Sequence, residues 1–274
     1  MSNCISRRTF IVGNAVGVIG GSIATLRAAA QAPRTQGDFS RVKALVFDTF
    51  GTVVDWRTSV TQQVRELATR KGLKIDAVKF ADTWRGGYQP AMNRVRTGEL
   101  PWTKLDDLHR LILNKLLVDF GIAGKLSETE VGALNYAWHR LQPWPDSVSG
   151  LTRLKKKFII APLSNGNIAL MTDLAKFGGL PWDCILGAEL VHHYKPDREV
   201  YQSAADFLNL KVDEVMMVAA HLGDLGAAKG VGLRTGFVTR PLEYGPDGKP
   251  DLQPSASVDV AARDFNDLAT KLGA

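Results

Sequence analysis

Residues 43–52 read Lys43-Ala-Leu-Val-Phe-Asp48-Thr-Phe-Gly-Thr52, an apolar run closed by an acid, a threonine, an aromatic residue, a glycine and a second threonine. An apolar run of about five residues closed by turn-forming residues is typical of a strand that is covered on both faces in a parallel sheet. Asp48 then lies at the carboxyl end of the strand, where open α/β sheets bind their ligands. A carboxylate in this position is either a nucleophile that forms a covalent ester or a cap for the turn. The stretch alone leaves both interpretations open.

The overall composition is that of a globular protein, with 45% hydrophobic and 23% charged residues among 274. No stretch after residue 30 is long and apolar enough to span a bilayer, so we expect no membrane contact once an N-terminal signal is removed. Arg7, Arg8 and Arg27 supply three of the six net positive charges, and the remaining +3 is too little to predict a nucleic-acid partner. Beyond the first thirty residues Cys184 has no cysteine to pair with, which excludes a disulfide framework.

The N-terminus begins with the segment Ser6-Arg7-Arg8-Thr9-Phe10-Ile11, followed by an uncharged run as far as Leu26 and by three alanines at 28–30. This order resembles a twin-arginine export signal. We therefore expect residues 1–40 to be a signal peptide and linker, and the mature chain to be periplasmic. A membrane anchor or a fortuitous leader is the alternative.

The rest of the chain alternates between two patterns. Residues 58–143 have helical spacing, and glycines and prolines divide them into about four helices. Strand-like runs follow at Phe158–Leu163, Cys184–Leu186, Glu214–Ala220 and Thr235–Val238, with helical segments between them. The pattern predicts an α/β fold, a Rossmann-like doubly wound parallel sheet formed by residues 41–57 and 144–274, with residues 58–143 inserted as a helical cap.

Polar side chains stand at or just beyond the ends of the predicted strands, and parallel strands bring these ends to one edge of the sheet. They comprise a nucleophile candidate, anion-binding groups, a cation and a second carboxylate, namely Asp48 with Thr52, Ser164 with Asn165, Lys195, and His221 with Asp224.

Five segments in matching order resemble the haloacid dehalogenase superfamily, and within it the 2-haloacid dehalogenases with a helical cap. They cover about residues 41 to 272 and are Phe47-Asp48-Thr-Phe-Gly51-Thr52, Trp84-Arg85, Leu163-Ser164-Asn165-Gly166, Tyr194-Lys195-Pro196-Asp197 with Tyr201, and Asp224. The resemblance implies a hydrolase of the (S)-2-haloacid dehalogenase type, which acts on carbon–halide bonds of small 2-haloalkanoic acids. It implies no metal and no organic cofactor, a small halogenated carboxylate as the partner, and a homodimer as one assembly to expect.

The resemblance also implies roles in forming and opening an ester. Asp48 would attack the halogen-bearing carbon, while Lys195 would keep Asp48 ionised and later stabilise charge on its carbonyl oxygen. Thr52 would orient Asp48, Tyr201 would support Lys195, and Asp224 would orient the hydrolytic water.

Substrate contacts are implied in the same way. Ser164 and the backbone amides of Thr49 and Phe50 would bind the substrate carboxylate, and Arg85 with Asn165 would receive the halide. Each residue also has an ordinary structural interpretation. Arg85 could be a solvated charge on a cap helix, Ser164 and Asn165 could cap the next helix, Lys195 could be a loop lysine and Tyr201 a core residue.

Two departures separate this chain from metal-dependent phosphatases of the superfamily. Phe50 replaces the acid two residues after the nucleophile, and Ala220 replaces an acid four residues before Asp224. Phosphoryl transfer is therefore disfavoured. A phosphatase and a catalytically silent carboxylate-binding protein are the two rival functions.

The chain also departs from the pattern of the 2-haloacid dehalogenases themselves. Around the hydrolytic water and the halide, Ala219, His221 and Gly223 replace a serine, an asparagine and an aromatic residue of that family. We expect His221 to be mostly neutral at pH 7 and near Asp224, where it could accept a proton from the water. The alternative is that His221 packs beneath the cap or tethers a loop.

Overall fold

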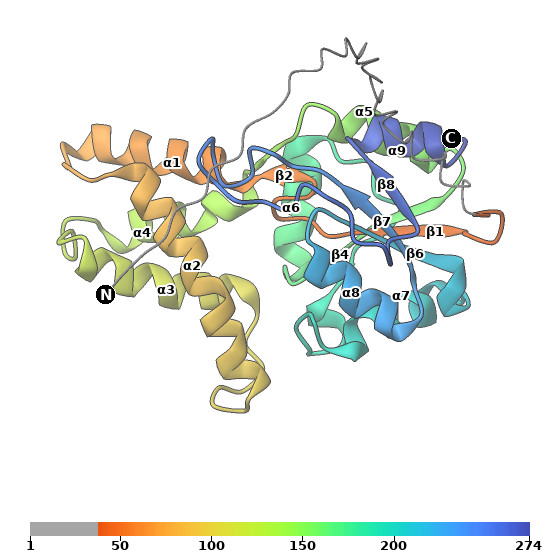
Figure 1. Cartoon of the computed structure of the whole chain (residues 1–274). Coiled ribbons are helices and arrows are strands. Elements are labelled where there is room, and N and C mark those ends of the chain that lie inside the picture. The colour runs from red at the N-terminus through yellow and green to blue at the C-terminus, as the bar shows by residue number, and fades with distance from the viewer. Residues whose placement is uncertain (1–37) are drawn as a thin grey trace, which may run out of the picture. The chain divides into compact units, whose positions relative to one another are not determined.

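The computed structural model describes residues 38–274, and the expected signal at the N-terminus lies outside them. Within these residues a six-stranded parallel sheet has the order β5-β4-β1-β6-β7-β8 (Figure 1). Its strands are β1 Ala44–Phe47, β4 Ile159–Ser164, β5 Leu186–Gly187, β6 Val215–Ala219, β7 Arg234–Val238 and β8 Val260–Ala262.

The central strand β1 is buried because both faces of the sheet are covered. Leu45 and Phe47 point into one apolar cluster, whereas Ala44 and Val46 point into the other. This alternation follows from the two-residue period of a strand. The helices α5 Ser147–Lys155 and α9 Phe265–Lys271 lie on one face, and α7 Arg198–Leu208 and α8 Leu222–Val231 lie on the other (Figure 1). The helix α6 Ile168–Gly178 contributes Leu170, Met171 and Leu174 to the first cluster.

The predicted doubly wound sheet is confirmed, with two differences at its edges. The run at Cys184–Leu186 forms only the short strand β5, which begins at Leu186. The strand β8 was not predicted, because its three residues follow a long loop and are too few for an alternating pattern.

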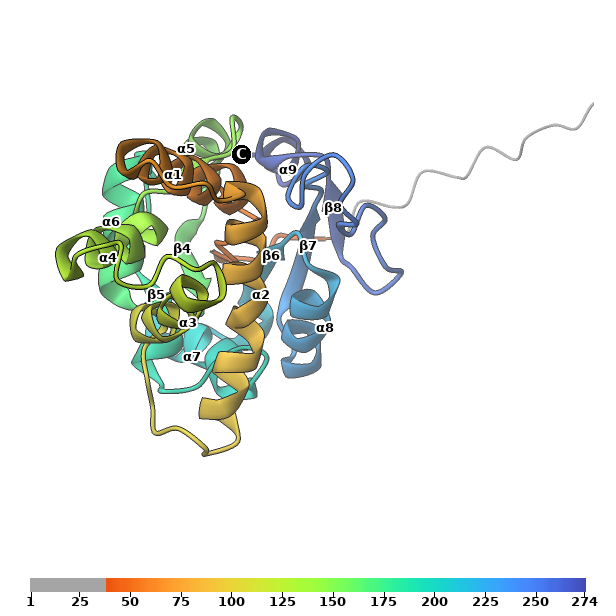
Figure 2. The same cartoon turned by 90° about the vertical axis from the view of Figure 1, so that its left-hand side faces the viewer.

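The helical insertion forms a cap between β1 and β4. It contains α1 Trp56–Lys71, α2 Ala77–Arg96, α3 Leu105–Asp119 and α4 Glu128–Asn135, and α2 crosses in front of the sheet when the cap faces the viewer (Figure 2). A two-stranded antiparallel stem of β2 Val54–Asp55 and β3 Gln142–Pro143 joins the cap to the core. Gly72 ends α1 in the left-handed conformation that glycine adopts readily.

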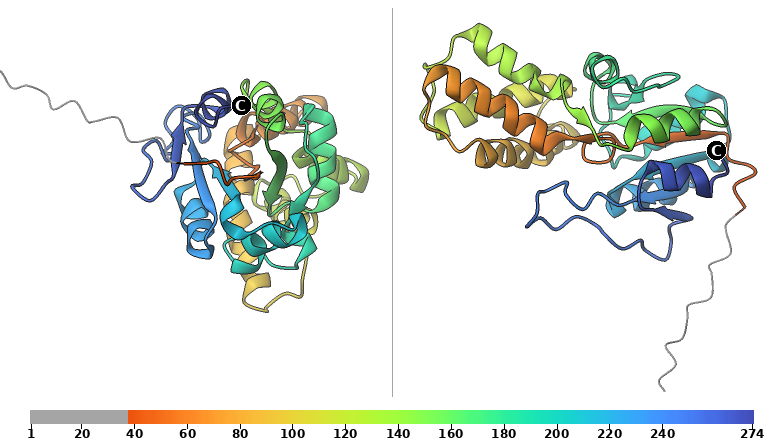
Figure 3. Two further views of the ribbon diagram at one scale, coloured as in Figure 1. Left: turned by 90° about the vertical axis from the view of Figure 1, so that its right-hand side faces the viewer. Right: turned by 90° about the horizontal axis from the view of Figure 1, so that it is seen from above.

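The segment between β7 and β8 reaches toward the cap (Figure 3). Arg240 anchors it, because its guanidinium donates to both carboxylate oxygens of Asp146 at 2.6 and 2.9 Å and to the Thr52 carbonyl at 2.8 Å. The buried pair fixes this segment beside the turn that follows β1. Among residues 38–274 no helix is long and apolar enough to cross a membrane.

Candidate active site

Asp48 stands at the carboxyl end of β1 and is 8% exposed. The Thr52 hydroxyl donates a hydrogen bond of 2.7 Å to its Oδ2 atom, as expected for a residue that orients Asp48. Gly51 between them has φ +86°, a left-handed conformation that favours glycine. The turn therefore brings the threonine side chain back onto the carboxylate.

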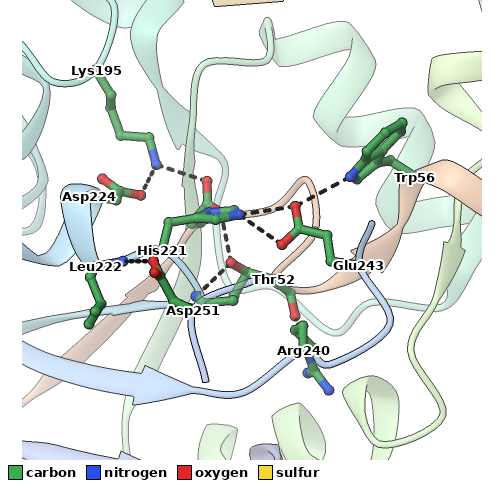
Figure 4. Close-up of polar contacts among 12 residues, drawn as sticks. Thr52, Trp56, Lys195, His221, Leu222, Asp224, Arg240, Glu243 and Asp251 are labelled. Atoms are coloured by element: carbon green, nitrogen blue, oxygen red, sulfur yellow. Dashed lines mark hydrogen bonds and ion pairs between the residues drawn. The ribbon is translucent and has the colours of Figure 1, made fainter. Parts of the chain in front are cut away.

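Lys195 contacts two carboxylates, one of which is that of Asp224 (Figure 4). Its Nζ atom lies 2.9 Å from Oδ1 of Asp48 and 2.5 Å from Oδ2 of Asp224. The expectation for Tyr201 was wrong in its partner, because the phenol donates to Oδ1 of Asp224 at 2.6 Å. Tyr201 lies in the first turn of α7, where it faces a carboxylate in the first turn of α8. It therefore supports Lys195 only through Asp224.

The surroundings of Asp48 and Asp224 shift the pKa values of these two carboxylates in opposite directions. Burial alone would raise the pKa of Asp48, but Lys195 and the hydrogen bonds from His221 and Thr52 outweigh it and hold that pKa well below its ordinary value. Burial, followed by the charge of Asp48, raises the pKa of Asp224 despite Lys195. Asp48 is thus the carboxylate of this pair that is held ionised, and Asp224 is the more basic one.

His221 lines the same cavity as Asp224, but its two ring nitrogens face other acids. Its Nδ1 atom is 3.0 Å from Oδ2 of Asp48, and its Nε2 atom is 3.0 Å from both carboxylate oxygens of Glu243 (Figure 4). Burial would lower its pKa, but the two carboxylates outweigh burial and raise the pKa of His221 to about 10. The expectation of a neutral imidazole is therefore wrong, because two buried acids stabilise its charged form.

Sequence reasoning missed Glu243, which is 1% exposed in the segment that Arg240 anchors. No motif marks it, and it lies 22 residues beyond its partner His221. One signal could have found it. Glu243 follows the carboxyl end of a strand, as the predicted site residues do, but that strand is β7, whose polar residues were not considered.

The cap contributes Arg85 from α2. Its guanidinium carbon lies 4.2 Å from the ring centre of Tyr88 and 5.7 Å from that of Trp56, so the charge stacks on aromatic faces. Within residues 38–274 its buried Nε atom has no hydrogen-bond partner. Burial raises the pKa of Tyr88 to about 12, so its phenol is an O–H donor at neutral pH.

The remaining predicted residues either line the cavity or are buried. Asn165 lines the cavity, and its Oδ1 atom accepts a hydrogen bond of 2.7 Å from the Lys195 amide. Ser164 and Thr49 are buried, and the Ser164 hydroxyl accepts from the Gly166 amide at 3.1 Å. Carboxylate binding by Ser164 and by the amides of Thr49 and Phe50 stays a prediction.

These groups surround a cavity of about 320 Å³ between cap and core, the size class of small-molecule sites. Its lining combines acids, cations and aromatic rings: Asp48, Phe50, Arg85, Tyr88, Gln89, Asn165, Lys195, Pro196, Tyr201, His221, Gly223, Asp224 and Tyr244. A small anion with an apolar body suits both the positive groups and the rings.

A divalent cation does not suit the donor set of this site. The Lys195 ammonium binds Asp48 and Asp224 at once and occupies the position between them. Phe50 and Ala220 stand where further acids would be needed. In the part of the chain that the structure describes, no group of three or more His, Cys, Asp or Glu side chains could hold a metal ion. No step of the reaction is therefore assigned to a metal.

Comparison with known proteins agrees with this geometry. The sequence profile of haloacid dehalogenase-like hydrolases matches residues 42–232. (S)-2-haloacid dehalogenase 1 of Pseudomonas sp. (strain CBS-3) is 30% identical over 217 residues, which cover 74% of this chain and 88% of that protein.

Two solved structures are similar over most of their length. The defluorinating L-2-haloacid dehalogenase Rha0230 is 49% identical, with a TM-score of 0.83 over 85% of this chain and 96% of that chain. The L-2-haloacid dehalogenase PA0810 is 47% identical, with a TM-score of 0.80 over 84% of this chain and 99% of that chain. The profile match includes Asp48, Lys195 and Asp224, so the chain belongs to the haloacid dehalogenase-like hydrolase family.

Proposed function

We propose that this protein hydrolyses small 2-haloalkanoic acids through an ester on Asp48. The observation that carries the proposal is the contact of Lys195 with Asp48 in a cavity that Arg85 also lines from the cap. The ammonium keeps the buried carboxylate ionised, as a nucleophile requires. The similarity to (S)-2-haloacid dehalogenases supports the class of substrate.

The proposed reaction has two steps, formation and hydrolysis of the ester, and different residues act in each. In the first, Asp48 attacks the halogen-bearing carbon from behind, and the halide leaves toward Arg85 and Asn165 with the bonding electrons. In the second, Asp224 orients a water molecule that opens the ester, and the ester carbonyl becomes the carboxylate of Asp48 again. Tyr201 holds Asp224 in place through its 2.6 Å hydrogen bond.

A halide-release assay tests this function. We expect turnover of chloroacetate and bromoacetate, and faster turnover of (S)- than of (R)-2-chloropropionate, because one chiral cavity admits back-side attack on one enantiomer. Fluoroacetate belongs in the panel because a relative with 49% identity is described as defluorinating. No halide from any of these acids, with measurable binding, would indicate the silent carboxylate-binding protein.

The same assay separates the phosphatase alternative. Activity should survive EDTA, because Phe50 and Ala220 remove acids that a Mg²⁺-dependent phosphatase needs. Loss of halide release in EDTA with recovery on adding Mg²⁺, or Mg²⁺-dependent hydrolysis of a generic phosphate ester, would contradict the proposal.

We infer further that the protein is exported folded by the twin-arginine pathway and cleaved near Ala30 to Ala32. The paired arginines and the short uncharged run support this location. Replacing Arg7 and Arg8 by lysine should block translocation, as seen by immunoblotting of periplasmic fractions. Mature-size protein in the periplasm of that variant would contradict the twin-arginine interpretation.

A further inference from the structure

The two carboxylate oxygens of Asp48 have different surroundings. In the described part of the chain, Oδ1 accepts one hydrogen bond, from Lys195 at 2.9 Å. Oδ2 accepts two, from Thr52 at 2.7 Å and from His221 at 3.0 Å. An ionised carboxylate offers about two lone pairs on each oxygen. Oδ1 therefore keeps a lone pair for attack on the substrate carbon, whereas both lone pairs of Oδ2 are engaged.

With both acids ionised, His221 can donate to both of its partners only as an imidazolium. Each ring nitrogen faces carboxylate oxygens at 3.0 Å, Nδ1 toward Asp48 and Nε2 toward Glu243. A neutral imidazole carries a hydrogen on one nitrogen only, so it would direct a lone pair at one of these acids. The imidazolium donates to both and has no lone pair with which to accept a proton from water.

Glu243 is closely packed against the turn that carries Asp48. Trp56 Nε1 donates to its Oε1 atom at 3.3 Å, and a Cβ atom on Gly51 would lie 2.0 Å from the same oxygen. The left-handed turn and the space for Glu243 thus both require glycine at position 51. Esterification removes the charge of Asp48, and Glu243 is then the carboxylate that still faces the imidazole.

We propose that Thr52 and the imidazolium of His221, held by Glu243, form an oxyanion hole on Oδ2 of Asp48 for hydrolysis of the ester. This inference rests on the proposed function, since it needs the Asp48 ester. His221 is then a catalytic residue that touches a reacting atom, and Glu243 is a positioning residue that acts through it.

The bonds change as follows. Oδ1 of Asp48 bonds to the substrate carbon, and the carbon–halogen bond breaks as halide leaves with its electron pair. Water then bonds to Cγ of Asp48 and gives a proton to Asp224, while the carbonyl electrons move onto Oδ2. There the Thr52 hydroxyl and the Nδ1 hydrogen of His221 stabilise the charge. The Cγ–Oδ1 bond then breaks, Oδ1 leaves in the 2-hydroxy acid, and that oxygen takes the proton from Asp224. The second proton of the water, which remains on the new oxygen of Asp48, is released to solvent and restores the carboxylate.

The direction of the pH dependence distinguishes a donor from a base. A donor at His221 stabilises the oxyanion only while protonated, so ester hydrolysis should fall as pH rises through its pKa. A general base would make hydrolysis rise through the same pKa. The groups that face this imidazole are Asp48 and Glu243.

The test compares Glu243→Gln with wild type in single turnovers of chloroacetate from pH 6 to 11, with the ester followed by intact mass. Glutamine keeps the size and one oxygen acceptor but removes the charge. Halide release should remain about one per site, while ester hydrolysis at pH 8 should slow by about tenfold to a hundredfold, less than the full loss of an oxyanion donor. The alkaline fall of ester hydrolysis should lie about one to three pH units lower in the variant than in wild type.

Asp251→Asn is the matched control, because Asp251 accepts from the Leu222 amide at 2.8 Å next to His221 and the variant loses a carboxylate of the same kind. It should keep the wild-type pH profile. As a second readout, a pH titration of the imidazole ¹⁵N chemical shifts should show loss of the second ring proton at lower pH in Glu243→Gln than in wild type, and at the wild-type pH in Asp251→Asn.

Different results would contradict the proposed function and the oxyanion hole. Absence of any ester in wild type would contradict the proposed function itself. An ester that forms normally, with Glu243→Gln hydrolysing it at the wild-type rate or faster as pH rises, would overturn the oxyanion hole alone.

Discussion

Asp48→Asn is expected to lose about a million-fold in kcat, the scale seen when another covalent nucleophile is removed. The amide nitrogen has no charge to displace a halide, and the amide oxygen is a weak nucleophile. The protein should still fold, since Lys195 keeps its ion pair with Asp224 at 2.5 Å. Halide release measures the loss, and circular dichroism with thermal unfolding shows that the fold persists.

Isotope labelling shows whether wild-type Asp48 forms the ester. In a single turnover in ¹⁸O-water, the first product should carry ordinary oxygen from Oδ1, and Asp48 should acquire the heavy oxygen. Peptide mass spectrometry locates the label after repeated cycles. A first product that already contains ¹⁸O, with none in Asp48, would mean that water attacks the substrate directly.

Lys195→Met should have the second largest effect, a loss of about a hundredfold to a thousandfold in kcat, comparable to removing one preorganised electrostatic contact. Methionine fills similar space but leaves Asp48 and Asp224 buried without their shared cation. Breaking a buried ion pair in this way typically costs about 3–5 kcal/mol of stability. Urea unfolding measures that cost, and Lys176→Met, on an exposed part of α6, is the matched control.

The same variant predicts a shift in the acid limb of the pH profile. In wild type the pKa of Asp48 is depressed. The stability that ionised Asp48 contributes is therefore fully present above the ordinary pKa of an aspartate, and it is lost only as pH falls through the lower pKa of the folded state. Without Lys195 one of the two carboxylates takes up a proton, and Asp224 is favoured because His221 and Thr52 still hold Asp48. The apparent pKa on the acid side of the kcat–pH profile should therefore rise by about one to three pH units. An unchanged limb would show that Lys195 does not control these acids.

The sequence by itself determined the sheet and most of the cavity. Apolar runs that end in Asp48 and Ser164 identify buried parallel strands, and the carboxyl ends of such strands converge in any doubly wound sheet. Helical spacing in residues 58–143 similarly predicted the cap, because an amphipathic period is a local property. Residues whose position follows from the strand they end could therefore be predicted without coordinates.

Tertiary structure alone decided the partners and the charges. Tyr201 binds Asp224 and not Lys195, and His221 lies between Asp48 and Glu243, residues 173 and 22 positions away from it in the chain. A hydrogen bond or buried ion pair depends on separations near 3 Å, which no local pattern specifies. Because the protonation of a histidine follows from the charges that it meets after folding, the sequence could place His221 at a strand end but could not predict its cationic form.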